Sequence, residues 1–404
     1  MYDLAAFGAW LEFAVRWVHV ITGTAWIGSS FYFIALDLGL HRDRNLGSGA
    51  DGEEWQVHGG GFYHVQKYLV APKNMPDGLV WFKWESYSTW LSGFAMLALV
   101  YYLGAEFYLI DPAVMDLTTW QAVAISMASL ALGWVIYNTL CKVFVEANQT
   151  WLMVALFGVL VAMAWFYTQV FAGRAALLHL GAFTATIMSG NVFWLIIPNQ
   201  KIVVADLIAG RKPDAQYGKI AKQRSTHNNY LTLPVIFLML SNHYPLSFAT
   251  EYNWLIASLV FLMGVTIRHY FNSLHARKGN PHWTWGVTAL IFIAIMWLST
   301  APMAERADQM GARATKFAQA DGFEQVSEIV MGRCSMCHAA EPVWDGLLWP
   351  PKNIRLETEA QIANHARDIY LQAGISHAMP PANLSFIPDE ERAQIVAWYT
   401  GATP

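Results

Sequence analysis

The stretch Cys334-Ser335-Met336-Cys337-His338 forms a C-x-x-C-H motif near the end of a 404-residue chain. In such a motif the two thiols bond covalently to a porphyrin and the neighbouring imidazole reaches the iron, so all three side chains must share one helical turn. A redox-active or zinc-binding C-x-x-C pair would leave His338 unexplained. The motif therefore predicts one covalent haem c, attached through Cys334 and Cys337, with His338 as an axial iron ligand.

The second axial ligand is expected downstream, and Met379 is the best candidate. It lies in His377-Ala378-Met379-Pro380-Pro381, where the prolines prevent a continuous helix and a side chain can be presented to a flat cofactor. A methionine ligand would raise the haem potential, whereas His377 or His365 in its place would lower it. We therefore expect the iron ligands to be His338 and Met379.

Two predicted helices surround the motif. Residues 323–338 carry apolar side chains at helical spacing, and a second helix is expected after Pro388, where three acidic residues favour a helix N-terminus. We expect residues 322–404 to form a small helical monohaem cytochrome c domain. Residues 302–321 are expected to be a helical or extended connector to this domain.

The rest of the chain has the composition of a membrane protein. Hydrophobic residues make up 55% of the sequence, charged residues only 13%, and the formal net charge of −4 argues against a nucleic-acid partner. A helix needs about 20 apolar residues to cross a bilayer. Eight stretches qualify, at residues 10–37, 82–104, 119–140, 150–171, 176–197, 229–247, 252–271 and 283–300. The predicted fold is thus all-α, an eight-span transmembrane bundle over residues 1–301 followed by the cytochrome c domain.

Charge and haem chemistry predict the same orientation. An even number of spans places both chain ends on one side, and haem c is attached outside the cytoplasmic membrane of bacteria. Lys and Arg concentrate in cytoplasmic loops. The loops predicted inside contain Arg42, Arg44, Lys67, Lys73, Lys142, Lys201, Arg211, Lys212, Lys219, Lys222, Arg224, Arg277 and Lys278, while those predicted outside contain only Arg174. We expect a multi-pass protein of the bacterial inner membrane, embedded in lipid, with the N-terminus and the cytochrome c domain in the periplasm.

Two polar segments on the predicted cytoplasmic side each allow two interpretations. The glycine triplet 59–61, flanked by His58 and Phe62, indicates either a loop whose backbone approaches a ligand or an interfacial turn within an aromatic belt. In Thr226-His227-Asn228-Asn229-Tyr230, at the expected mouth of a span, His227 and Asn228 either line a polar pocket or cap the helix.

Ionisable residues at membrane depth are functional candidates. Glu12, Arg16 and His19 share one face of the first span. Arg16 could bind a planar anion while His19 or Glu12 moves its protons; alternatively, Glu12 and Arg16 neutralise each other and His19 bonds a neighbouring helix. His19 and His179 could also hold a b-type haem between helices. A rival set on the cytoplasmic side consists of Glu85, Arg268, His269, His64 and His227.

With these segments placed, the chain resembles the bacterial membrane-bound urate hydroxylase family, in which an eight-span urate oxidase domain is fused to a C-terminal cytochrome c. The resemblance covers nearly the whole chain. It rests on Arg16-Trp17-Val18-His19-Val20, Ala25-Trp26-Ile27-Gly28-Ser29-Ser30-Phe31-Tyr32-Phe33, the segments 58–72 and 226–234, and the haem motif.

This resemblance implies oxidation of urate to 5-hydroxyisourate, with water as the oxygen source and electrons leaving through haem c. The electron acceptor would be a periplasmic cytochrome c or a terminal oxidase. Urate is a monoanion at neutral pH, which a buried arginine and amide donors would suit. A cytoplasmic pocket would lie about 30 Å from a periplasmic haem, too far for direct electron transfer at useful rates. Either urate binds in the outer half near Glu12, Arg16 and His19, which is the site we expect, or another group relays electrons across the membrane.

Two other functions fit the same sequence. One is a membrane-anchored electron-transfer cytochrome that links a quinol pool to a terminal oxidase, which would need further membrane haems. The other is a transporter whose haem domain senses redox state.

Overall fold

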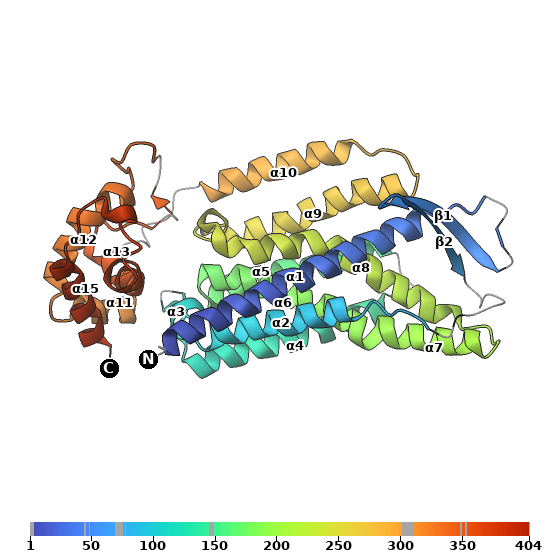
Figure 1. Ribbon diagram of the computed structural model, residues 1–404, viewed down its shortest axis with the longest axis horizontal. Helices are drawn as coiled ribbons and strands as arrows, with labels where there is room; N and C mark the ends of the chain where they lie inside the picture. The colour runs from blue at the N-terminus through green and yellow to red at the C-terminus, as the bar shows by residue number, and fades with distance from the viewer. Residues whose placement is uncertain are drawn as a thin grey trace.

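The computed structural model describes residues 4–43, 46–47, 49–68, 76, 78–112, 114–144, 149–300, 310–347, 350–351 and 354–403. The chain forms an elongated helical bundle with a β-hairpin at one end and a small helical unit at the other, beside the N-terminus (Figure 1). We call these the hairpin end and the tail end of the bundle. Residues 302–309 of the expected connector, together with Arg44 and Lys73, lie outside the described residues.

Helices run along the bundle between its two ends, most of them long (Figure 1). They are α1 (Leu4–Gly39), α2 (Trp84–Met96) with η1 (Leu97–Tyr102), the short α3 (Ala105–Tyr108), α4 (Thr119–Val143), α5 (Gln149–Val170), α6 (Gly173–Gly190) continuing through η2 (Asn191–Ile196) into α7 (Ile197–Ile208), α8 (Ala215–Leu240), α9 (Asn253–His275) and α10 (Trp283–Ser299). Short 3₁₀ turns, η3 (Ser241–His243) and η4 (Pro245–Ser247), join α8 to α9.

Five segments within the described part of the chain are long and apolar enough to cross a membrane. They are Phe7–Gly39, Thr119–Val143, Gln149–Val170, Gly173–Ile208 and Asn253–His275, and α10 is a shorter apolar helix. Helices α2 and α8 occupy the other two expected spans without meeting the same criterion. The structure thus has several helices that can span a membrane, and the number eight stays a prediction.

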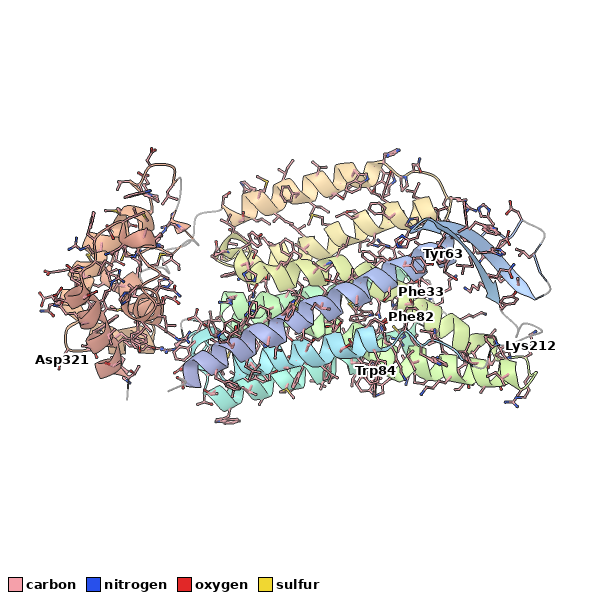
Figure 2. The ribbon with its side chains drawn as sticks, in the orientation of Figure 1. Phe33, Tyr63, Phe82, Trp84, Lys212 and Asp321 are labelled. Atoms are coloured by element: carbon pink, nitrogen blue, oxygen red, sulfur yellow. The ribbon has the colours of Figure 1, made fainter. Side chains whose placement is uncertain are left out.

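The structure is mostly helical, as predicted, and one β-hairpin departs from the all-α prediction. Strands β1 (Ala50–His58) and β2 (Gly61–Tyr68) pair in register from His58↔Gly61, with Gly59 and Gly60 at φ +57° and +80° in the turn. Two glycines between strands are a strong hairpin signal, because both positions of such a turn require positive φ. The rings of Phe33 and Phe82 meet edge to face on the hairpin side of the bundle, with their centres 4.7 Å apart (Figure 2).

Asp37 ties this hairpin to the bundle. The carboxylate of Asp37, near the end of α1, pairs with Lys67 of β2 and with Lys222 of α8, the latter at 2.8 Å. One anion therefore links three elements that are distant in sequence.

The bundle core lies around α6, which is the most enclosed helix. Its Phe183 is 1% exposed, and a Cβ on Gly133 of α4 would lie 2.4 Å from the Phe183 ring. A side chain at residue 133 would therefore separate α4 from α6. Between α8 and α9, a Cβ on Gly264 of α9 would lie 2.5 Å from the ring of Pro234 in α8. Glycine thus allows close packing of α4 against α6 and of α9 against α8.

The C-terminal unit has its own core. It contains α11 (Ala312–Ala318), α12 (Phe323–His338), α13 (Glu359–Asn364), α14 (Ala366–Ile369), η7 (Tyr370–Ile375), η8 (Pro381–Asn383) and α15 (Asp389–Ala402). Helices α12 and α15 begin where the sequence predicts. The Trp398 indole, 2% exposed, donates to the Phe317 carbonyl at 3.0 Å, so α11 also belongs to this core.

Candidate functional site

The C-x-x-C-H motif occupies the last turn of α12, so Cys334, Cys337 and His338 share one end of that helix. His338 Nδ1 lies 2.9 Å from the carbonyl oxygen of Ile354 and donates to it, which leaves Nε2 available for iron. Burial lowers the pKa of the His338 imidazole and favours the neutral form that a metal ligand requires. These residues fit a covalently attached haem c, which would be held by the two thiols and His338.

Large apolar side chains are exposed on the same unit. They include Val343 at 82%, Ile375 at 53%, Leu384 at 48% and Phe386 at 78%. The amide of Val343 bonds the carbonyl of Met336 within the motif, and the other three flank Met379 in the sequence. These exposed apolar side chains are candidates for contact with a bound porphyrin.

The Met379 segment is fastened to α15 by Arg392, a residue that sequence reasoning missed. The Arg392 guanidinium is 4% exposed, and its Nη1 donates to the Met379 carbonyl at 3.0 Å while Nη2 donates to Asn383 Oδ1 at 3.0 Å. The rival His365 lies 3.3 Å from Asp368, and His377 is exposed. Met379 as the iron ligand stays a prediction, with Arg392 positioning its segment.

Replacing Met379 with Ala should lower the haem midpoint potential by at least about 60 mV, a tenfold change in the one-electron equilibrium. The reason is that a thioether ligand favours ferrous iron. A spectroelectrochemical titration would measure the shift, and the charge-transfer band of methionine-ligated ferric haem should vanish. His377→Ala is the matched control and should keep both the potential and the band. An unchanged spectrum in Met379→Ala would show that another residue is the ligand.

A polar cluster lies inside the hairpin half of the bundle, which we call the central polar cluster. It consists of Tyr137 on α4, Asn191 at the start of η2, and Arg224, His227 and Asn228 on α8, all 0–5% exposed. The Tyr137 hydroxyl lies 2.8 Å from His227 Nδ1, and Asn191 Nδ2 donates to both Tyr137 Oη at 3.1 Å and Asn228 Oδ1 at 3.0 Å. Because α8 begins at Ala215, His227 and Asn228 lie within the helix, and the capping interpretation is wrong.

Arg224 is the least satisfied member of this cluster. Its Nη2 donates to Asn138 Oδ1 at 2.9 Å and its guanidinium carbon lies 4.8 Å from the centre of the Tyr137 ring, whereas buried Nε and Nη1 have no hydrogen-bond partner. No carboxylate among the described residues pairs with it. Asn191 Oδ1 is likewise buried without a partner. Burial of an unpaired charge is costly, so these free donors and this acceptor are suited to an anionic ligand with N–H groups.

A cavity of about 870 Å³ lies beside the central polar cluster, between α5, α8 and α9. Its wall is mostly apolar, with polar groups from Gln223, Thr226, His227, Tyr230 and His269. A largely apolar cavity with a few convergent polar groups is typical of small-molecule sites. His227 is the residue that belongs to both the cluster and the cavity wall.

A second buried arginine, Arg268, lies against another face of α8. Arg268 Nε donates to Asn229 Oδ1 at 3.2 Å, Nη2 donates to Asn272 Oδ1 at 3.0 Å, and the guanidinium carbon lies 4.0 Å from the centre of the Phe31 ring. The rival set from the sequence is divided. His64 bonds Glu53 at 2.7 Å within the hairpin, while His269 lines the cavity.

The predicted outer-half residues are arranged differently. Glu12 and Arg16 form an ion pair at 2.6 Å with side chains 40% and 29% exposed, which is the neutralised alternative of the two. His19 Nδ1 lies 3.1 Å from the Thr89 carbonyl and 3.2 Å from Ser92 Oγ, so His19 bonds α2. A Cβ on Gly93 would lie 2.8 Å from the His19 ring, which shows how closely α2 approaches.

His179 does not fit the b-type haem suggested for the pair with His19. Its Nδ1 bonds the Ala175 carbonyl and its Nε2 bonds Ser126 Oγ, both at 2.8 Å. The imidazole is completely buried, with the Phe171, Tyr167 and Tyr101 rings 4.7, 5.8 and 5.9 Å away between centres. Both ring nitrogens are occupied and the ring is enclosed, so no haem ligand is available there.

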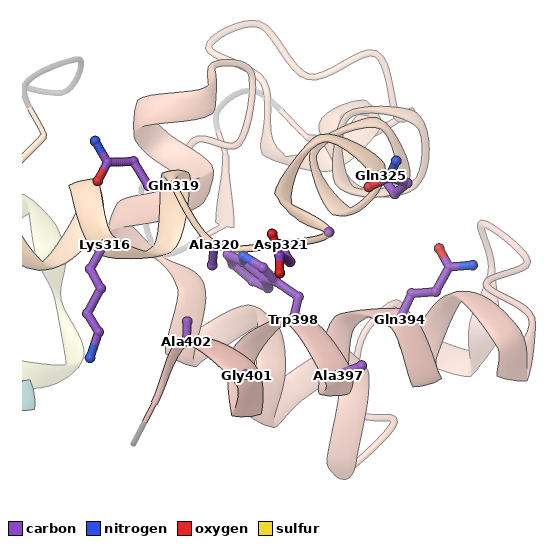
Figure 3. Close-up of a pocket in the computed structure, with 11 residues that line it drawn as sticks. Lys316, Gln319, Ala320, Asp321, Gln325, Gln394, Ala397, Trp398, Gly401 and Ala402 are labelled. Carbon is purple, nitrogen blue, oxygen red and sulfur yellow. The ribbon is translucent and has the colours of Figure 1, made fainter.

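A second hollow, of about 680 Å³, lies in the C-terminal unit around Trp398 (Figure 3). Lys316 of α11 contributes to its wall, together with Asp321 and Gln325 at the start of α12. The haem motif is at the other end of that helix. The hollow is therefore separate from the haem-binding residues.

Comparison with known proteins identifies the bundle. A family model described as "Urate oxidase N-terminal" matches residues 5–299, which span α1 to α10 and include the central polar cluster. No curated protein and no solved structure matches the chain.

Proposed function

This chain belongs to the urate oxidase N-terminal family, and from that premise we propose that it oxidises urate inside the membrane bundle and passes the electrons to a haem c on its C-terminal unit. The product would be 5-hydroxyisourate, with the added oxygen taken from water. The observation that carries the proposal is Arg224, a buried cation with two free donors in the centre of the matched region.

The central polar cluster is the substrate site that we favour. Urate is a planar monoanion whose edge alternates carbonyl and N–H groups. Arg224 offers Nε and Nη1 as donors, and Asn191 Oδ1 can accept from a ring N–H. Arg16 in the outer half is already paired with Glu12 at 2.6 Å, so its charge is less available to a substrate anion. We therefore place the substrate in the hairpin half of the bundle.

His227 is positioned to handle protons in this reaction. The urate monoanion and one water give 5-hydroxyisourate, one proton and two electrons. With Nδ1 bonded to Tyr137, the other nitrogen of His227 can accept a proton from the attacking water. Asn228 is held by Asn191 and by the Met188 carbonyl, at 3.0 Å each, and would orient the substrate. A haem c would accept the electrons one at a time, so each turnover requires it to be reoxidised twice.

We further propose that the hairpin end faces the cytoplasm and the C-terminal unit the periplasm. Lys67 and Lys222 pair with Asp37 near the end of α1, and Arg277 donates to the Gly39 carbonyl at that end, so all three lie near the hairpin, in agreement with the excess of cytoplasmic Lys and Arg. A periplasmic cytochrome c or a terminal oxidase would then receive the electrons.

Anaerobic addition of urate to the oxidised, purified full-length protein tests this function. We expect prompt haem reduction, and product formed in ¹⁸O-labelled water should carry the label. A quinol-linked carrier would instead show b-type bands and be reduced by quinol, and a transporter would move urate with no haem reduction. Absence of reduction by urate under every condition would remove the proposed enzyme.

A further inference from the structure

Two arginines of the C-terminal unit contact the short helix α3 at the tail end of the bundle. Arg313 Nη1 of α11 donates to the Glu106 carbonyl, and Arg367 Nη1 of α14 donates to the Tyr108 hydroxyl at 2.9 Å. Their guanidinium carbons lie 4.2 and 4.0 Å from the centre of the Phe107 ring. We call Phe107, Tyr108, Arg313 and Arg367 the α3 clamp.

The α3 clamp is supported from both sides. Within the bundle, Arg174 lies 5.1 Å from the Tyr108 ring, so this ring has a cation from the bundle and a second, Arg367 at 5.2 Å, from the C-terminal unit. Within the unit, both clamp arginines face Tyr399. Burial raises the pKa of the Tyr399 hydroxyl, and the nearby charges of Arg313 and Arg367 oppose that rise.

A row of neighbouring rings extends from Phe183 in α6 to this contact. Phe183 lies 6.4 Å from Tyr167, Tyr167 lies 5.8 Å from His179, His179 lies 5.9 Å from Tyr101, and Tyr101 lies 6.2 Å from Tyr108, all between ring centres. The hydroxyl of Tyr108, the last ring, bonds the C-terminal unit. The contact therefore lies at the end of a row of rings that begins at Phe183.

Cation–π contacts and single hydrogen bonds are individually weak. The two partners belong to one chain, however, and a short tether raises the effective concentration of one for the other to about the millimolar range. Weak contacts are then sufficient to populate a docked arrangement and still permit release.

We propose that the α3 clamp is the intramolecular docking surface at which the C-terminal unit receives electrons from the bundle, with Arg313 and Arg367 as positioning residues. This rests on the proposed function. Each transfer removes one electron from the bundle and reduces one ferric haem to ferrous, and two transfers balance the two electrons lost by one urate.

The first test is the double variant Arg313→Gln/Arg367→Gln in the full-length protein. In anaerobic stopped-flow experiments with urate, we expect haem reduction about tenfold slower or more, with urate affinity, haem spectrum and midpoint potential unchanged. Lys316→Gln is the matched control, because this substitution removes a positive charge from α11, the helix of Arg313, at a residue that does not touch α3. The Lys316→Gln protein should reduce its haem at the rate of the unmodified protein. A double variant with the original rate would overturn the proposal.

The second test separates docking from chemistry. Phe107→Cys/Arg367→Cys should be joined efficiently by a short bis-maleimide, and the joined protein should reduce its haem with urate at least as fast as the unjoined double-cysteine protein. Failure to join, or slower reduction after joining, would overturn the docking proposal. Should urate fail to reduce the haem of the unmodified protein, the proposed function fails, while the joining yield still reports on docking.

Discussion

Arg224→Gln is expected to weaken urate binding by roughly a hundredfold, because removal of one partner of a buried, hydrogen-bonded charge pair costs about 2–5 kcal/mol. Glutamine keeps a donor near Asn138 but removes the charge and the two unpartnered guanidinium nitrogens. Equilibrium dialysis with labelled urate would measure the affinity directly, independently of haem reduction.

Protein stability distinguishes this effect from misfolding. A buried cation without a counter-charge is a destabilising feature in the free protein, so Arg224→Gln should unfold at an equal or higher temperature while it binds urate poorly. Arg16→Gln provides the matched comparison, because it removes an arginine whose charge is already paired with Glu12. If Arg16→Gln loses urate binding and Arg224→Gln keeps it, the urate site lies in the outer half of the bundle, near Arg16.

Cys337→Ala is expected to abolish stable covalent haem and reduce urate turnover to background, while the protein still inserts in the membrane. The bundle core and the core of the C-terminal unit are built from separate sets of buried residues, neither of which contains Cys337. Loss of the thioether should therefore remove the electron exit and leave the bundle intact.

Haem staining on a denaturing gel would measure the loss of covalent haem. The rate of urate consumption without oxygen would measure the loss of turnover. Cys141→Ala is the control, since that thiol is buried in the bundle away from the motif. Turnover retained with a small artificial acceptor would show that the haem serves only as the exit. Turnover retained with the natural acceptor would show that electrons leave by another path.

The sequence predicted the elements whose signals are local. The motif fixed the end of α12, and the acidic run after Pro388 marked the start of α15. Hydropathy likewise located the apolar helices. The hairpin was missed because the glycines were interpreted as a ligand-binding loop or an interfacial turn without strands on either side, although two glycines between strands are themselves a hairpin signal.

The central polar cluster was found only in part, for a physical reason. Arg224 lies in a segment rich in Lys and Arg, where its charge served as a topology signal. Asp214, whose side chain accepts from the Gln216 amide at 2.8 Å, starts α8 well before the apolar stretch begins. Polar residues such as Arg224, which hydropathy assigns to a loop, therefore lie on α8 inside the bundle. Arg392 was missed because its role depends on a contact across the C-terminal fold.

The direction of the Asn191 side chain depends on the number of residues in the π-helical turn η2 as well as on the residue type. Such a turn holds an extra residue relative to the α-helix around it, so everything beyond Gly190 is rotated about the helix axis compared with an uninterrupted helix. The extra residue in η2 thus sets the direction of the side chains that follow it. A helical pattern of 3.6 residues per turn would not reveal this rotation. In related chains, the number of residues between α6 and α7 would then show which side chains face the bundle interior, as the presence of an amide residue at the Asn191 position does.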